Sequence, residues 1–274
     1  MEKLNINLVG TSFTHLTGGN KGYSVHGKES KCIQWKFDNS LEISFYIDNE
    51  LDTAFIDNVN GVKYGWLLES KFVTPTIVEK VKSNYEEYFK IFKYIFTHNK
   101  ELLDLDDRFK WCPANGYWIK EPKIYPKTKM ISFITSNKSV TDGHKERLKW
   151  VDMLGDQVDL YGRGFNEIEN KEEGLCDYMF SVVIENGIYE SYYTEKILDC
   201  FATGTIPVYL GSPDISKHFN EDGIILLDNE FDISEEIYYS KMEAIKNNLK
   251  IIKQIEVLED FIYLNYLKKE KKSV

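Results

Sequence analysis

The second half of the chain alternates short apolar runs with amphipathic segments, and this alternation is the strongest constraint on its fold. ISFITS, VDLYG, FSVVIE and TIPVYLG have the composition of strands, whereas HKERLKWVDML and TEKILDCFAT have that of helices. Strands separated by helices of about ten residues indicate β–α–β units, whose strands form a parallel sheet covered on both faces. We therefore expect a Rossmann-like lobe from about residue 131 onward.

The first half predicts a second lobe. LNINLV is a strand, the stretch from Cys32 to Asp57 alternates like further strands, and WLLES is a short apolar run that ends in a carboxylate. Residues 120–130, KEPKIYPKTKM, contain two prolines and show no periodicity, which is typical of a linker. The expected divisions are an N-terminal lobe at 1–125, a nucleotide-binding lobe at 126–252, and a C-terminal helix with a basic tail at 253–274. A cleft is expected between the lobes.

The bulk composition excludes several classes of protein. The net charge of −10 and the pI of about 5.2 argue against nucleic acid as the main partner. The four cysteines are far apart and show no CxxC spacing, so we expect reduced thiols and no zinc site. MEKLNINLVG is too short an apolar run for a signal peptide, and no long apolar window follows it. A soluble, intracellular protein is the expectation.

Two strand ends of the second lobe carry polar residues where ligands of open parallel sheets bind. At the first, Ser136 and Asn137 follow the strand, and Arg147 lies in the early turns of the next helix. A cation near a helix N-terminus opposes the helix dipole, so both favour a bound anion. The alternative is a solvated cationic face, which is the simpler interpretation of Lys145.

The second strand end is richer in such groups, which are Glu185, Asn186, Tyr192, Glu195 and Lys196. A helix that begins near Thr194 offers free backbone N–H groups, and Lys196 adds a full charge, so a diphosphate would fit. The carboxylate of Glu195 suits vicinal ribose hydroxyls. An exposed charge pair without function remains the alternative.

Other motifs carry less information. The chain has neither a P-loop nor a GxGxxG fingerprint. DLDD at 104–107 could be a metal-binding DxD sequence, but a solvated acidic turn is the simpler interpretation. His15 and His26 flank a Gly-rich loop at a spacing that suits no helical metal motif. We expect no metal site.

At this point the motifs resemble a known family. FSVVIENG…YYTEKILDCFATGTIPVYLGSPDISKHF is similar to the signature of the α-1,3/1,4-fucosyltransferases, glycosyltransferase family 10. FITSNKS…ERLKWVDML…VDLYGRG resembles the same family upstream, so the likeness covers roughly residues 131–219. In the first lobe, WLLESKFVTP resembles the segment that carries the family's proposed catalytic carboxylate, here Glu69, and DDRFKWCP resembles a later segment.

The resemblance implies an α/β fold of GT-B type, with two Rossmann-like lobes and a cleft between them. It implies transfer of fucose from GDP-fucose to a hydroxyl of an oligosaccharide acceptor, with inversion and in α-1,3 linkage. Glu69 would be the base, Arg147 and Lys196 would stabilise the leaving GDP, and Glu195 would bind the ribose. The remaining donor-binding residues would be Tyr192, Asn186, Glu185, Ser136 and Asn137. No cofactor would be required, although divalent stimulation stays open.

Alternatives remain at this stage. Ile184 and Leu210 stand where the family usually has Phe and Trp, so another nucleotide sugar is open, as is an inactive nucleotide- or sugar-binding protein. The missing anchor favours a cytoplasmic bacterial or viral member. The tail YLKKEKKSV, with Phe261, Tyr263, Leu264, Tyr266 and Leu267 ahead of it, could contact an anionic membrane surface. The alternative is a C-terminal helix that packs back on the first lobe.

Overall fold

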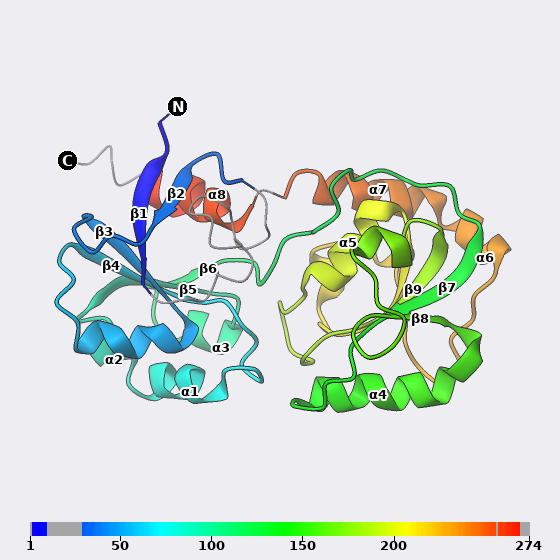
Figure 1. Cartoon of the computed structure of the whole chain (residues 1–274), viewed down its shortest axis with the longest axis horizontal. Helices are drawn as coiled ribbons and strands as arrows, with labels where there is room; N and C mark the ends of the chain where they lie inside the picture. The colour runs from blue at the N-terminus through cyan, green and yellow to red at the C-terminus, as the bar shows by residue number, and fades with distance from the viewer. Residues whose placement is uncertain (1, 10–28, 256, 269–274) are drawn as a thin grey trace. The chain divides into compact units, whose positions relative to one another are not determined.

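The computed structural model describes residues 2–9, 29–255 and 257–268. The chain divides into two compact units (Figure 1): Met1–Gly116 together with Glu256–Val274, and Tyr117–Ile255. The Gly-rich loop with His15 and His26 and the tail residues 269–274 lie outside the described residues.

The first unit contains a six-stranded sheet in the order β2-β1-β3-β4-β5-β6, with every neighbouring pair parallel. Its strands are β1 (Leu4–Val9), β2 (Ile33–Lys36), β3 (Ile43–Ile47), β4 (Val62–Leu67), β5 (Phe92–Thr97) and β6 (Phe109–Trp111). Its helices are α1 (Pro75–Ser83), α2 (Tyr85–Tyr88), α3 (Lys100–Leu103) and α8 (Leu258–Ile262), and α8 continues into a π-helical turn (Tyr263–Leu267).

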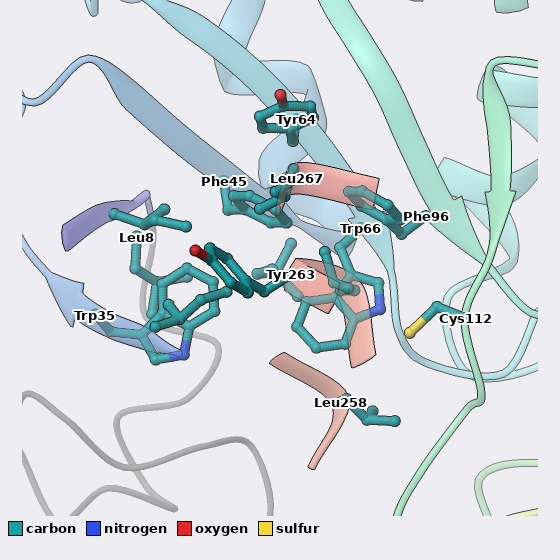
Figure 2. Packing of buried hydrophobic residues seen from close by; sticks show 14 residues of the cluster. Leu8, Trp35, Phe45, Tyr64, Trp66, Phe96, Cys112, Leu258, Tyr263 and Leu267 are labelled. Carbon is teal, nitrogen blue, oxygen red and sulfur yellow. The ribbon is translucent and has the colours of Figure 1, made fainter. Parts of the chain in front are cut away.

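The C-terminal segment completes the core of the first unit. One face of its sheet presents large aromatic side chains, including Trp35, Phe45 and Trp66, and these pack against Leu258 and Tyr263 from the C-terminal segment (Figure 2). Burial of so much apolar area is the main stabilising contribution here.

Buried hydrogen bonds also attach the C-terminal segment to the residues that precede β2. Asp260 accepts hydrogen bonds from Ser30 Oγ at 2.6 Å and from the Cys32 amide at 2.9 Å. The apolar residues ahead of the basic tail therefore pack on the first unit, as expected of a C-terminal helix that packs back on the first lobe. The opposite face of the sheet packs against α1 and α2 through residues such as Ile77, Val81 and Tyr88.

The second unit contains a five-stranded parallel sheet in the order β11-β10-β9-β7-β8. Its strands are β7 (Lys129–Ile134), β8 (Asp159–Tyr161), β9 (Tyr178–Ile184), β10 (Ile206–Leu210) and β11 (Ile225–Leu226). Its helices are α4 (Asp142–Leu154), α5 (Glu195–Thr203), α6 (Glu235–Ser240) and α7 (Met242–Ile252). In Figure 1, α4 and α5 lie on opposite sides of this sheet. The expected α/β class is confirmed.

Alternation along β9 explains the two covered faces. Val182 packs with Trp150 of α4, whereas Val183 packs with Ile197 of α5. In both units the first strand lies between the second and the third strands of that unit. The strand that follows β1 lies on one side of it and β3 lies on the other, and β8 and β9 flank β7 in the same way, so the strand order reverses at β1/β3 and at β7/β9. Such a switch point is where open α/β sheets bind ligands.

The structure places the boundary between the units at 116/117 rather than at 125/126. The reason is that the proline-containing segment is bound to the second unit. The amides of Trp118 and Ile119 donate to Asp199, and the amide of Lys123 donates to the carbonyl of Ala202 at 2.9 Å. The second boundary follows Ile255, because the segment after it packs in the first unit.

The proline in the second sheet also has a structural explanation. Pro207 pairs with Ser181 of β9, but the neighbouring β11 reaches only Val208 and Tyr209. The missing N–H therefore costs no ladder bond toward β11. Among the described helices, none has the length and apolar character needed to cross a membrane.

Candidate functional site

A pocket of about 210 Å³ opens in the second unit at the carboxyl ends of β7 and β9, beside the N-terminus of α5. It therefore lies at the switch point of this sheet. Its polar lining comes from Thr135, Ser136, Arg147, Lys171, Ser181, Glu195, Lys196 and Asp199. The lining carries three cationic side chains and two carboxylates, so its formal charge is +1, which favours an anionic ligand.

Arg147 is held rigidly at the end of β9. Its side chain is only 6% exposed, its Nε donates to the carbonyl of Ile184 at 2.9 Å, and its guanidinium also donates to Asn186 Oδ1. Burial lowers the pKa of Arg147 from its ordinary value, yet a guanidinium stays protonated in proteins. The interpretation of Arg147 as part of a solvated cationic face is therefore wrong.

The start of α4 approaches the β9 end through a glycine. A Cβ atom at Gly143 would lie 2.6 Å from the carbonyl oxygen of Asn186, so a larger residue would push the helix away. Lys145, by contrast, is an exposed side chain that pairs with Asp142 at 3.0 Å. Lys145 thus lies on the solvated face of α4, as the sequence suggested, whereas Arg147 is buried.

Glu185 joins the end of β9 to the start of α5. The side chain is 1% exposed, and its two oxygens accept from the amide of Thr194 at 2.9 Å and from the hydroxyl of Thr194 at 2.7 Å. Thr194 is the N-cap of α5, a position that favours Thr because its side chain can bind a free helix N–H. Both carboxylate oxygens therefore have partners inside the protein, and donor contact by Glu185 stays a prediction.

Glu195 and Lys196 are not an exposed pair. Their side chains are 17% and 23% exposed, and Lys196 Nζ lies 3.2 Å from Glu195 Oε1 and 2.9 Å from Thr194 Oγ1. Burial would raise the pKa of Glu195, but the charges of Lys196 and Lys171 hold it well below its usual range. An ionised carboxylate and a helix N-terminus with a lysine thus share one pocket, as a sugar hydroxyl and an anion would require.

Of the other predicted residues of this unit, Ser136 lies in the pocket lining, whereas Asn137 and Tyr192 do not. Ser136 lines the pocket, whereas the exposed Asn137 follows it in the loop after β7, where its amide donates to the carbonyl of Arg163 at 3.1 Å. Tyr192 is 2% exposed, and its ring stacks on Tyr189 with the centroids 4.6 Å apart. Tyr192 thus supports the loop between β9 and α5, and its donor contact stays a prediction.

Sequence reasoning missed four polar pocket residues: Thr135, Lys171, Ser181 and Asp199. Lys171 Nζ lies 2.7 Å from Asp199 Oδ2 and 3.4 Å from Glu195 Oε1. Asp199 is fully buried on the helix that begins with Glu195. A carboxylate on an otherwise apolar helix face was a usable signal, whereas nothing in the pattern placed Lys171 beside it.

In the first unit, Glu69 follows β4 and its side chain is exposed. Its amide donates to Asp48 Oδ1 at 3.1 Å, and the same oxygen accepts from the amide of Leu68 at 2.9 Å. Asp48 follows β3 with a φ of 48° and is 8% exposed. Burial, aided by the charge of Glu69, raises the pKa of Asp48 to about 7. Two carboxyl groups thus follow adjacent parallel strands.

The acidic turn at 104–107 has cationic partners of its own. Asp104 pairs with Lys100 at 2.6 Å, and Asp106 pairs with Arg108 at 2.7 Å. Over residues 2–9, 29–255 and 257–268, no three His, Cys, Asp or Glu side chains are grouped as a metal site would need. The interpretation of this segment as a turn rests on these ion pairs.

Comparison with known proteins agrees with this geometry. Residues 124–251 match the family model described as glycosyltransferase family 10 (fucosyltransferase) C-term. The alpha-(1,3)-fucosyltransferase FucT of Helicobacter pylori is 38% identical over 78 residues, which are 28% of this chain and 16% of that protein. The human 4-galactosyl-N-acetylglucosaminide 3-alpha-L-fucosyltransferase 9 is 26% identical over 210 residues, which are 73% of this chain and 54% of that protein.

Solved structures show the same fold over nearly the whole chain. A crystal structure of an α1,3-fucosyltransferase superimposes with a TM-score of 0.55 at 18% identity, covering 98% of this chain and 89% of that one. One with GDP-fucose gives a TM-score of 0.50 at 18% identity, covering 91% and 81%. The chain spans about half or less of the length of the two curated relatives. The two parallel-sheet units are thus of GT-B type, and the match over residues 124–251 assigns the second unit to glycosyltransferase family 10, the fucosyltransferases.

Proposed function

We propose that this protein transfers fucose from GDP-fucose to a hydroxyl of an oligosaccharide acceptor, with inversion and in α-1,3 linkage. The observation that carries the proposal is the pocket at the β7/β9 switch point, which combines Arg147, Lys196 and the α5 N-terminus with the ionised Glu195. Support also comes from relatives named α-1,3-fucosyltransferases and from a solved relative that holds GDP-fucose.

Each charged group has a task in this reaction. Arg147, Lys196 and the N–H groups of α5 would stabilise the negative charge that develops on GDP as the bond from fucose C1 to the phosphate oxygen breaks. Glu195 would accept hydrogen bonds from the ribose hydroxyls. The pocket of about 210 Å³ is below the usual 300–1,000 Å³ of complete ligand sites, so it suits part of the donor, the ribose and diphosphate.

The acceptor side needs a base, and we assign it to Glu69. Its carboxylate would take the proton from the acceptor hydroxyl while that oxygen bonds to fucose C1, on the face opposite the leaving GDP. A direct displacement of this kind inverts the anomeric carbon and needs no covalent enzyme intermediate. The name of the human relative suggests a 4-galactosyl-N-acetylglucosaminide as the first acceptor to test.

Three features of the proposal are argued from sequence. The reaction is proposed to need no cofactor, because positioned cations can do the work of a metal on the diphosphate. A cytoplasmic location is part of the same proposal. Membrane contact through the basic tail remains a prediction, because residues 269–274 lie outside the described residues.

Donor binding is tested by thermal unfolding with GDP, UDP or ADP. Ligand linkage stabilises the folded state by about 2.7 kcal/mol at a hundredfold excess over Kd, so millimolar GDP should raise the melting temperature. UDP and ADP should have smaller effects. A shift with UDP and none with GDP would contradict the choice of donor.

A further inference from the structure

A lysine that is remote in sequence from the other donor-site residues reaches into the pocket. Lys171 begins a 3-10 turn, Lys171–Gly174, which Asn170 and Glu173 cap at its start. Its half-buried ammonium lies 2.7 Å from Asp199 and 3.4 Å from Glu195, the two acidic side chains of α5 that line the pocket. Lys171 therefore bridges two carboxylates on successive turns of one helix.

Asp199 fixes this lysine in place. Its side chain is fully buried, and Oδ1 accepts from the amides of Trp118 at 2.6 Å and Ile119 at 3.3 Å, while Oδ2 faces Lys171. Burial raises the pKa of Asp199, and the adjacent ammonium acts against that shift. Together, these contacts leave Lys171 little freedom to turn away from α5.

Glu195 shares its charge partners with the ligand. Oε1 of Glu195 lies 3.2 Å from Lys196 and 3.4 Å from Lys171. If Lys196 turns toward a diphosphate, Glu195 loses one of these two cations inside a largely buried site. An uncompensated charge in such a site is costly, so Lys171 would then help to keep the carboxylate ionised and in place.

We propose that Lys171 is a positioning residue of the donor site, which holds the Glu195 carboxylate toward the ribose hydroxyls while Lys196 binds the diphosphate. This inference rests on the proposed function, because it assigns the ribose to Glu195. In this proposal Lys171 contacts neither the diphosphate nor the reacting atoms and acts only through Glu195. Its loss should therefore weaken recognition of the ribose rather than binding of the diphosphate.

The test compares GDP with 2′,3′-dideoxy-GDP by isothermal titration calorimetry. The wild type should prefer GDP, and Lys171→Met should weaken GDP binding about tenfold while the dideoxy compound changes much less. Lys171→Arg keeps the charge and should restore most of the preference. Lys145→Met is the matched control, because it removes an exposed lysine of α4 and should leave both affinities unchanged.

A second variant keeps the test valid if Lys171→Met unfolds by leaving Asp199 unpaired. Lys171→Met with Asp199→Asn removes both charges, while the Asn oxygen can still accept from the two amides. It should fold and show the same loss of preference. Equal weakening of both nucleotides, or an unchanged preference, would overturn the role of Lys171. No GDP binding by the wild type would instead overturn the proposed donor site.

Discussion

At the residue scale, Asp48 shows how a residue at a strand end can fix the backbone that carries a proposed base. It begins a 3-10 helix, Asp48–Phe55, directly after β3, and one of its oxygens accepts the amides of Leu68 and Glu69. Its φ of 48° lies in the left-handed region, which Asp and Asn tolerate better than most residues. The backbone under Glu69 is therefore fixed by a carboxylate that is itself buried.

Asp48→Asn should stabilise the protein in a pH-dependent way. A carboxyl group whose pKa rises from 3.8 to about 7 on folding keeps a proton between these pH values that the unfolded chain has lost. Asp48 therefore leaves the free energy of unfolding unchanged below pH 4. It lowers the free energy of unfolding as the pH rises toward 7, and the loss persists above pH 7. Asn still accepts both amides without the charge, so the variant should gain about 2–4 kcal/mol over wild type above pH 7.

Denaturant unfolding at pH 4 and at pH 8 measures this difference. The two proteins should be close in stability at pH 4, with Asp48→Asn ahead at pH 8. Asp222→Asn serves as a control, because Asp222 is an exposed acidic residue of the second unit. A gain at pH 4 that equals the gain at pH 8 would mean that the charge of Asp48 is not the cause.

Glu69→Gln tests the proposed base. It keeps the shape of the side chain and removes the proton acceptor, so kcat should fall by about 10²–10⁴-fold. GDP affinity should stay near the wild-type value, since the proposed donor site lies in the other unit. The measurement is steady-state transfer together with GDP calorimetry, and Glu87→Gln, an exposed residue that pairs with Lys90, is the control.

Retention of more than about a tenth of the wild-type rate by Glu69→Gln would place the base elsewhere.

The sequence pointed to Glu69 through a motif, whereas no sequence motif pointed to Asp48. Asp48 accepts hydrogen bonds from the amides of Leu68 and Glu69, which follow β4, and a local sequence pattern cannot reveal this long-range contact. The same holds for the contact between Lys171 and Glu195, because the strand β9 lies between the two residues in sequence.

At the scale of elements, the last described helix is a structural part of the first unit. Leu258 is fully buried among Trp35, Trp66 and their neighbours. Leu258→Ala should cost about 2–5 kcal/mol, because it removes buried methyl groups and leaves a cavity. Unfolding monitored by calorimetry would measure the loss, with Ile56→Ala as the control, since Ile56 is 85% exposed.

The stabilisation of Leu258→Ala by GDP should persist, because the proposed donor pocket belongs to the second unit. A wild-type melting profile for Leu258→Ala would show that the C-terminal helix does not support the first unit.

The apolar residues of this segment indicated that it could pack on the first lobe. The surface on which this segment packs could not be predicted, because β1 and β2 are separated from it by most of the chain.

Element prediction succeeded where periodicity was unambiguous. The helices expected over HKERLKWVDML and TEKILDCFAT are α4 and α5. The apolar stretch YFKIFKYIF has a pattern that fits helix and strand alike, and the structure divides it between the end of α2 and β5. The linker prediction over 120–130 placed the boundary too late, because backbone hydrogen bonds to Ala202 and Thr203 attach that segment to the second unit.

At the scale of the whole molecule, the two units repeat one topology. Each has its first strand between the second and the third, and each carries functional candidates at the carboxyl ends of its strands. The β–α–β alternation predicted this arrangement for the second unit, where about half the chain matches the family model. The first unit was harder to predict, because its hydrophobic core is completed by helical residues from the other end of the chain.

Incubation of the protein with GDP-fucose and a 4-galactosyl-N-acetylglucosaminide tests the central claim most directly. Mass spectrometry should show free GDP and an acceptor heavier by one fucose, and NMR should show an α-1,3 linkage with inverted anomeric configuration relative to the donor. UDP-linked and other GDP-linked sugars in parallel should give no product. Binding of GDP-fucose without transfer to a panel of β-galactosides, or transfer from another donor only, would contradict the account.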